Sequence, residues 1–118
     1  MIADDVEDMR MLLRIAFETA EFSVVGEAAD GLEALDLWHG DQDGVCLVVL
    51  DQMMPGRTGL EVADVILAER PEQAVVLFSA HIDDAMRAEA AAVGIRACVS
   101  KRDALQLPAS DVVRQACD

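Results

Sequence analysis

Short apolar runs alternate with longer amphipathic segments along the whole chain. Five runs are short, apolar and partly β-branched, as buried strands are: residues 1–3, 22–28, 45–50, 74–80 and 95–100. Each is followed by a segment in which apolar residues recur every three or four positions, which is the period of one helix face. The pattern therefore predicts five strand–helix units.

Apolar residues at helical spacing also predict which face of each helix is buried. Residues 83–94 and 110–118 are the fourth and fifth predicted helices, and the fifth is short. In the first three helices the expected inward residues are Met9, Leu12, Leu13, Ala16 and Phe17, then Leu32, Leu35 and Trp38, then Leu60, Ala63, Ile66 and Leu67.

Helix ends are marked by residues that favour caps or stops. Asp30, Thr58 and Ser110 stand where a side chain can accept a hydrogen bond from the first turn of the second, third and fifth helices. Gly94 is placed to end the fourth helix, and Pro71 prevents the third from continuing. These signals support the helix assignments independently of the apolar spacing.

Strands that alternate with helices of this length favour a parallel sheet, because right-handed crossovers place helices on both of its faces. The expected fold class is therefore α/β, doubly wound. The chain has 118 residues, of which 53% are hydrophobic, enough to bury the core of one domain. Neither a repeat nor a flexible linker suggests a second domain.

The charge of the chain excludes several classes of partner. A formal net charge of -14 repels nucleic acid and anionic membrane, so direct contact with either is not expected. No apolar run approaches the roughly 20 residues of a membrane span, and the acidic start "MIADDVEDMR" differs from a signal peptide. A soluble cytoplasmic protein is expected. Cys46, Cys98 and Cys117 lack metal-ligand spacing and are interpreted as buried or incidental thiols.

Polar residues end four of the five predicted strands. Asp4 and Asp5 follow the first strand, Asp51 the third, Ser79 ends the fourth and Lys101 follows the fifth. Each alone has an ordinary interpretation as a cap, a turn residue or a surface charge. In a parallel sheet, however, all carboxyl ends lie along one edge, where ligands bind. The sequence therefore predicts one shared pocket.

Three carboxylates at one edge repel each other by about 4 kcal/mol per pair at about 4 Å and an effective dielectric of about 20. Such a cluster favours a cation, and oxygen ligands without histidine or cysteine suit Mg²⁺. Lys101 and the hydroxyl of Ser79 would complete a phosphate site beside the metal. The chain lacks the G-x-x-x-x-G-K-[ST], G-x-G-x-x-G and G-x-S-x-G motifs. The remaining nucleophile is Asp51, whose carboxylate can accept a phosphoryl group as an acyl phosphate.

At this point the motifs "IADD", "VVLDQMMPGRTGLEV", "VVLFSAH" and "ACVSK" together resemble the receiver domains of bacterial two-component response regulators. The resemblance covers essentially the whole chain, residues 1–118. The sequence of these motifs is most similar to that of receivers in LuxR/NarL-type transcriptional regulators, which precede a helix-turn-helix output domain. The resemblance implies a flavodoxin-like fold, in which a five-stranded parallel sheet of order 2-1-3-4-5 is flanked by five helices.

The resemblance also implies roles for the acidic residues. Asp51 is the expected phosphoacceptor. Asp5 and Asp51 are expected to bind Mg²⁺ through their carboxylates, and Asp4 to bind it directly or through water. Met53 is expected to contribute its backbone carbonyl rather than its side chain.

The resemblance assigns the remaining two polar residues to the phosphoryl group itself. Ser79 takes the place of the switch hydroxyl, and Lys101 is expected to pair with the phosphoryl oxygens. Two positions depart from the family pattern. Cys98 stands where receivers usually have an aromatic residue that swings inward on activation. Arg102 replaces a proline that commonly follows the lysine, so a trans peptide bond is expected there.

The leading hypothesis is a phosphorylation-activated signalling switch. A sensor histidine kinase or a phosphotransfer protein would donate its phosphoryl group to Asp51. Phosphorylation would then alter the surface formed by the fourth helix, fifth strand and fifth helix. This surface would change its binding to an output domain, another partner or a second copy. The domain would catalyse only its own phosphorylation and slow dephosphorylation. One alternative is a haloacid-dehalogenase-like phosphatase, although Met53 occupies the place of that family's second acid. Another is a scaffold that is not phosphorylated, against which the intact acidic triad argues.

Overall fold

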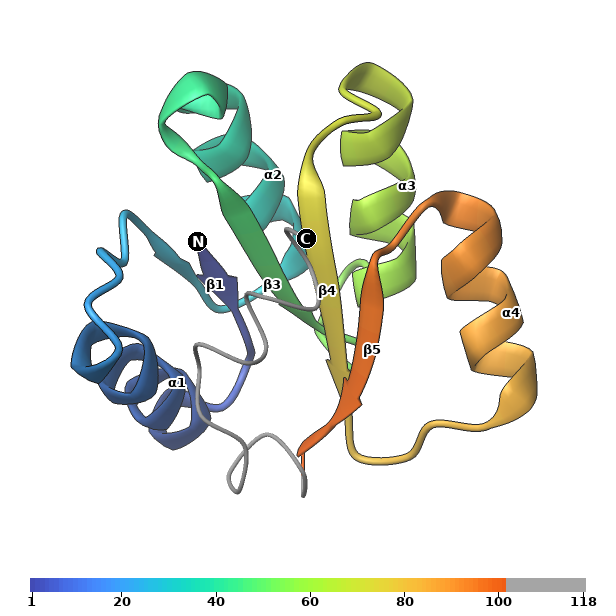
Figure 1. The fold of residues 1–118 in the computed structure, drawn as a ribbon, viewed down its shortest axis with the longest axis horizontal. Helices are drawn as coiled ribbons and strands as arrows, with labels where there is room; N and C mark the ends of the chain where they lie inside the picture. Colours follow the sequence, from blue (N-terminus) through green and yellow to red (C-terminus); the bar gives the residue numbers. More distant parts are fainter. Residues whose placement is uncertain (102–118) are drawn as a thin grey trace.

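Five parallel strands form the central sheet of residues 1–101, the part of the chain that the computed structural model describes (Figure 1). Their order is β2-β1-β3-β4-β5, as predicted. The strands are β1 (Ile2–Ala3), β2 (Glu27–Ala28), β3 (Leu47–Asp51), β4 (Ala74–Ser79) and β5 (Ala97–Ser100). The doubly wound, flavodoxin-like α/β class is confirmed.

Within these described residues, four α-helices flank the sheet: α1 (Glu7–Thr19), α2 (Gly31–Gly40), α3 (Gly59–Glu69) and α4 (Asp84–Val93). A short 3-10 helix, Gln42–Gly44, precedes β3. In Figure 1 α1 lies on one side of the sheet, and α2 and α3 lie on the other. No helix of residues 1–101 is long and apolar enough to cross a membrane. The predicted fifth helix and its cap, Ser110, lie outside the described residues.

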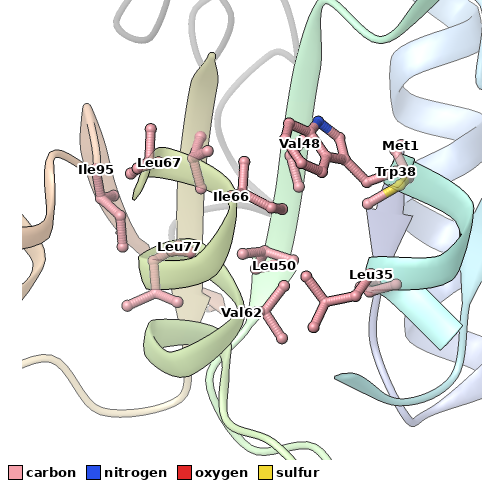
Figure 2. Packing of buried hydrophobic residues seen from close by; sticks show 14 of the residues in the cluster. Met1, Leu35, Trp38, Val48, Leu50, Val62, Ile66, Leu67, Leu77 and Ile95 are labelled. Carbon is pink, nitrogen blue, oxygen red and sulfur yellow. The ribbon is translucent and has the colours of Figure 1, made fainter. Parts of the chain in front are cut away.

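The sheet buries apolar side chains on both faces. Val48 and Leu50 of β3 belong to the cluster that packs under α2 and α3, which includes Trp38 (Figure 2). Val49, between them, belongs to the opposite cluster, with Phe17 of α1. Because successive strand side chains point to opposite faces, a strand covered on both sides is apolar throughout. This explains the continuous apolar runs in the sequence.

Three predicted helix boundaries are confirmed by their capping contacts. The Asp30 side chain accepts a hydrogen bond from Glu33 N at 2.8 Å. Thr58 Oγ1 accepts from Glu61 N at 3.2 Å, and the Glu61 side chain accepts from Thr58 N at 3.1 Å, which is a complete capping box. Gly94 ends α4 in the left-handed region, with φ 103°. Local sequence therefore fixes where these helices begin and end.

Two predicted inward residues are exposed instead: Leu12 by 46% and Leu32 by 58%. In α1 the buried stripe runs through Leu13 and Phe17, four residues apart. Leu12 is one position before this stripe and is turned away from the sheet. In α2 the start at Gly31 directs Leu35 inward and leaves Leu32 at the side of the helix. The predicted apolar faces were therefore too wide.

The second strand is also shorter than predicted, because only Glu27–Ala28 of the run at 22–28 is strand. Within residues 1–101 this strand lies at the edge of the sheet and pairs with β1 alone, which itself covers just Ile2–Ala3. Val25 is 53% exposed, so its apolar character is not explained by the core. The short first strand, by contrast, agrees with the sequence.

Candidate functional site

The carboxyl ends of the strands bring the predicted polar residues to one edge of the sheet. Asp51 is the last residue of β3 and Ser79 the last of β4, while Asp4 follows β1 and Lys101 follows β5. Asp4, Asp51 and Ser79 are buried, with only 1%, 2% and 4% of their surfaces exposed. Asp5 next to Asp4 is exposed. The edge thus carries a polar cluster with three buried side chains and one exposed carboxylate.

Lys101 bridges the two buried carboxylates. Its Nζ atom lies 3.1 Å from Asp51 Oδ2 and 3.3 Å from Asp4 Oδ2. β4 separates β3 from β5 in the sheet, so the lysine side chain crosses the end of β4 to reach the acids. This single ammonium provides the positive charge that allows two carboxylates to be buried together.

The acidic cluster is completed by Asp5. One carboxylate oxygen from each of Asp4, Asp5 and Asp51 can be chosen so that all three lie within 4.8 Å of one another. Burial raises the pKa of Asp51 to about 6; the Lys101 ammonium opposes this rise and the Asp4 carboxylate adds to it. The negative charge of Asp51 is therefore costly in the protein alone, although the group is largely ionised at neutral pH.

Two features of the cluster suit a hard divalent cation. Oδ2 of Asp4 and Oδ2 of Asp51 are buried, and both rely on the same Lys101 ammonium for positive charge. All three ligand groups are carboxylates, without histidine or cysteine, as Mg²⁺ prefers. Met53 is two residues beyond Asp51, with its backbone N 3.4 Å from Asp51 Oδ1 and its side chain pointing outward, since the residue is 71% exposed. The donor set thus fits Mg²⁺.

The first acidic residue is held by contacts that the sequence did not reveal. Asp4 Oδ1 accepts a hydrogen bond from Val6 N at 2.9 Å, and Arg10 donates to the Asp4 carbonyl at 2.7 Å. Arg10 in turn lies 3.9 Å from a carboxylate oxygen of Glu27 in β2. The contact between Arg10 and Glu27 depends on the pairing of β2 with β1, so no local pattern could have identified it.

Ser79 lies at the expected edge, but its hydroxyl points along its own loop. Ser79 Oγ donates a hydrogen bond to the carbonyl of His81 at 2.9 Å. Asp51 and Lys101 are instead joined to each other by their ion pair. The structure therefore brings together the three acids and the lysine, and places the hydroxyl beside them with a different partner.

Cys98 in β5 is half-buried and packs at the margin of the cluster under α2 and α3. Burial raises the pKa of the Cys98 thiol, and the nearby charge of Arg87 partly offsets the rise. Cys46 is exposed, and both thiols are free, as expected of incidental cysteines. Cys117 and the predicted trans peptide at Arg102 lie outside the described residues.

Comparison with known proteins assigns the chain to a family. Residues 1–109 match the family model of the response regulator receiver domain. The chemotaxis protein CheY of Listeria monocytogenes is 33% identical over 101 residues, which is 86% of this chain and 83% of that protein.

Solved structures agree. The receiver domain of the putative response regulator NarL from Mycobacterium tuberculosis is 28% identical, with a TM-score of 0.86 over 98% of this chain and 92% of that one. A LuxR-family response regulator from an Aurantimonas species is also 28% identical, with a TM-score of 0.84 over 98% of this chain and 83% of that one. The chain therefore belongs to the receiver domains of response regulators, which are signalling domains.

Proposed function

We propose that residues 1–118 form one receiver domain that acts as a phosphorylation-activated switch. Asp51 accepts the phosphoryl group from a phosphohistidine of a sensor histidine kinase or a phosphotransfer protein. The observation that carries this proposal is the placement of Asp51: a buried carboxylate at a strand end, 3.1 Å from Lys101 and clustered with Asp4 and Asp5. Family membership supports the same assignment.

In the proposed reaction an oxygen of the Asp51 carboxylate attacks phosphorus. The bond between phosphorus and the donor nitrogen breaks, an acyl phosphate forms, and the leaving histidine nitrogen keeps the electron pair of the broken bond. Asp51 must be ionised to react, which its pKa of about 6 permits at neutral pH. Lys101, already beside Asp51, would pair with a phosphoryl oxygen. Attack by water on the same acyl phosphate would return the domain slowly to its starting state.

Mg²⁺ is the proposed cofactor. Asp5 and Asp51 would hold the ion through their carboxylates, Asp4 directly or through water, and Met53 through its backbone carbonyl. When bound, the ion supplies positive charge to neutralise the phosphoryl oxygens. The two buried carboxylates of Asp4 and Asp51 share the charge of Lys101, which supports this assignment, because a divalent cation would supply further positive charge to both.

Activation would begin at Ser79. Its hydroxyl would leave the His81 carbonyl and bond to a phosphoryl oxygen, which pulls on the loop between β4 and α4. Cys98 is too small to fill the volume of an aromatic ring, so the change would travel through this loop and α4. The altered surface around α4 and β5 would change binding to a partner, to a second copy, or to a helix-turn-helix output domain in transcriptional regulation. We place this signalling in the cytoplasm.

The two alternatives are less well supported. A haloacid-dehalogenase-like phosphatase needs a second acid two residues after its nucleophile, and that position holds Met53, whose side chain is 71% exposed. A scaffold without phosphorylation would have no use for three clustered carboxylates, two of them buried. The family match favours the receiver over both.

Chemical trapping tests the acceptor assignment. The protein is incubated with acetyl phosphate and Mg²⁺, and borohydride then reduces any aspartyl phosphate to homoserine. Peptide mass spectrometry should find homoserine at position 51 and nowhere else. Homoserine at another aspartate would move the acceptor site, and a complete absence of homoserine in a protein that binds Mg²⁺ would favour the scaffold.

A further inference from the structure

Gln52, the residue directly after Asp51, joins the end of β3 to both β4 and α3. Its backbone N donates to the carbonyl of Phe78 in β4 at 3.0 Å. Its carbonyl accepts from Gly59 N at 3.1 Å, and its side-chain Oε1 accepts from Leu60 N at 2.9 Å. Three hydrogen bonds therefore converge on the residue next to the proposed phosphoacceptor.

These bonds hold the first turn of α3 directly against Asp51. A Cβ atom added to Gly59 would lie 2.5 Å from the Asp51 carbonyl oxygen and 2.7 Å from Leu77 Cδ1. Atoms cannot approach so closely, so only glycine allows the helix to sit on this peptide group. The loop at 52–58 is thus closed at its base, and any displacement of α3 is passed to the backbone of Asp51.

The Gln52 side chain is a second cap on a helix that already has one. Thr58 and Glu61 form the capping box of α3, and both belong to the helix or its own N-cap. Gln52 instead satisfies Leu60 N from the end of a neighbouring strand. The capping box joins residues of the helix and its N-cap, whereas the Gln52 side chain joins the helix to the residue next to the proposed acceptor. The two caps therefore differ in what they connect.

We infer that Gln52 is a positioning residue: its side-chain bond to α3 fixes the backbone at Asp51 and thereby the direction in which the Asp51 carboxylate points. This inference rests on the proposed function of Asp51. Gln52 itself need not touch the phosphoryl group or the metal. Without the bond to Leu60, the backbone of Gln52 keeps its hydrogen bonds to β4 and to Gly59, but α3 holds it through one bond instead of two. The backbone at Asp51 is then held less firmly, and displacements of about 1 Å at a reacting group can slow a reaction up to 100-fold.

Three variants separate positioning from helix stability. Gln52→Leu removes the acceptor, Gln52→Glu retains an acceptor oxygen at the same reach, and Thr58→Ala removes the other cap of the same helix. With acetyl phosphate and saturating Mg²⁺, we expect Gln52→Leu to slow phosphorylation about tenfold. Gln52→Glu should recover most of the rate, because a carboxylate is also favoured at a helix N-terminus. Thr58→Ala should leave the rate nearly unchanged at a similar loss of stability.

A second readout does not depend on phosphorylation. In the metal-free protein, the amide chemical shifts of Asp51 and Met53 should move clearly more in Gln52→Leu than in Gln52→Glu, which changes the same position but keeps an acceptor for Leu60 N, and should move little in Thr58→Ala. If Gln52→Leu does not fold, Gln52→Asn replaces it, since its amide is one methylene too short to reach Leu60. Equal slowing by Gln52→Leu and Thr58→Ala, or none by either while the wild type reacts, would overturn the inference. A wild type that gains no phosphoryl group would instead contradict the proposed function, and the amide shifts would still decide whether Gln52 positions Asp51.

Discussion

The ammonium nitrogen of Lys101 lies 3.1 Å from Oδ2 of Asp51 and links the end of β5 to the end of β3. Burial lowers the pKa of Lys101, but its contacts with Asp51 and Asp4 outweigh burial and raise it, so the lysine stays charged at neutral pH. Asp4 and Asp51 pair with this ammonium, and Asp5 adds a third negative charge to the cluster. The site therefore keeps an excess of negative charge, which is the physical basis for expecting a divalent cation.

Lys101→Met should destabilise the metal-free protein, because it leaves two buried carboxylates without a cation. Loss of one partner of a buried pair costs about 3–5 kcal/mol, and we expect the lower end of this range at pH 7 because Asp51 can take up a proton. At pH 5, below the Asp51 pKa of about 6, the loss should be smaller. Urea denaturation at both pH values measures the difference. An equal loss at both would show that the lysine does not stabilise a charged Asp51.

Asp51→Asn should stabilise the metal-free protein, and the gain should depend on pH. The pKa of Asp51 is raised from 3.8 to about 6 in the folded state, so in this range the folded protein binds more protons than the unfolded chain. The stability that comes from the protonated form of Asp51 is therefore fully present below pH 3.8 and is lost as the pH rises through about 6. Solvent around the exposed Asp5 weakens the effect, and we expect a gain of about 1–2 kcal/mol at pH 7.

The same denaturation series tests this sign. The gain from Asp51→Asn should shrink towards zero below pH 3.8, where Asp51 is protonated in both states. Saturating Mg²⁺ should also reduce the gain at pH 7, because the ion stabilises only the ionised wild-type site. A gain that is constant across pH would mean that the substitution acts through packing and not through charge.

Asp5→Ala should weaken Mg²⁺ binding by at least about tenfold, since loss of even an outer-shell partner of a metal ligand has an effect of this size. Asp5 is the exposed acid of the cluster, so its removal leaves no buried group unpaired and relieves repulsion. Stability without metal should stay equal or rise. Asp8→Ala is the matched control, because Asp8 is exposed in the first turn of α1 and outside the cluster. Calorimetric titration with Mg²⁺ compares them, and equal affinities would remove Asp5 from the metal site.

The switch should act through the backbone of the loop from Ser79 to Asp83 and through α4. Ser79 Oγ now bonds to the carbonyl of His81, and Cys98 is a small side chain at the margin of the core. On addition of beryllium trifluoride, a phosphoryl mimic, with Mg²⁺, amide chemical shifts should change strongly from residue 79 through α4 and little at Cys98. Ser79→Ala should reduce the loop changes. Shifts centred on Cys98 with a quiet loop would contradict this description.

The sequence predicted the parts of this molecule that depend on local patterns. Buried strands such as β3 were visible as apolar runs, and Thr58 marked a helix start with its own side chain. The strand-end rule also predicted that Asp51 and Lys101 would meet, because parallel strands place their carboxyl ends together. Leu12 was misplaced because helical spacing alone does not say how wide the buried stripe is.

Other parts of the site could not be predicted because they depend on the three-dimensional path of a loop or helix, although the partners are close in sequence. Arg10 reaches the Asp4 carbonyl only because α1 returns along β1. Gln52 reaches Leu60 only because α3 packs against the end of β3. The hydroxyl of Ser79 lies at the predicted edge, but its direction follows from the shape of the loop after β4. Residue type and spacing carry no information about such bonds.

Intact mass spectrometry of the wild type and Asp51→Asn, each incubated with acetyl phosphate with and without Mg²⁺, tests phosphorylation at Asp51. Asp51→Asn keeps the shape of the side chain and should fold, since it removes a charge that burial disfavours. The wild type should gain the mass of one phosphoryl group only when Mg²⁺ is present, and Asp51→Asn should gain none. A wild type that stays unmodified with Mg²⁺ bound, or an Asp51→Asn variant that gains the same mass, would contradict the assignment of Asp51 as the phosphoacceptor.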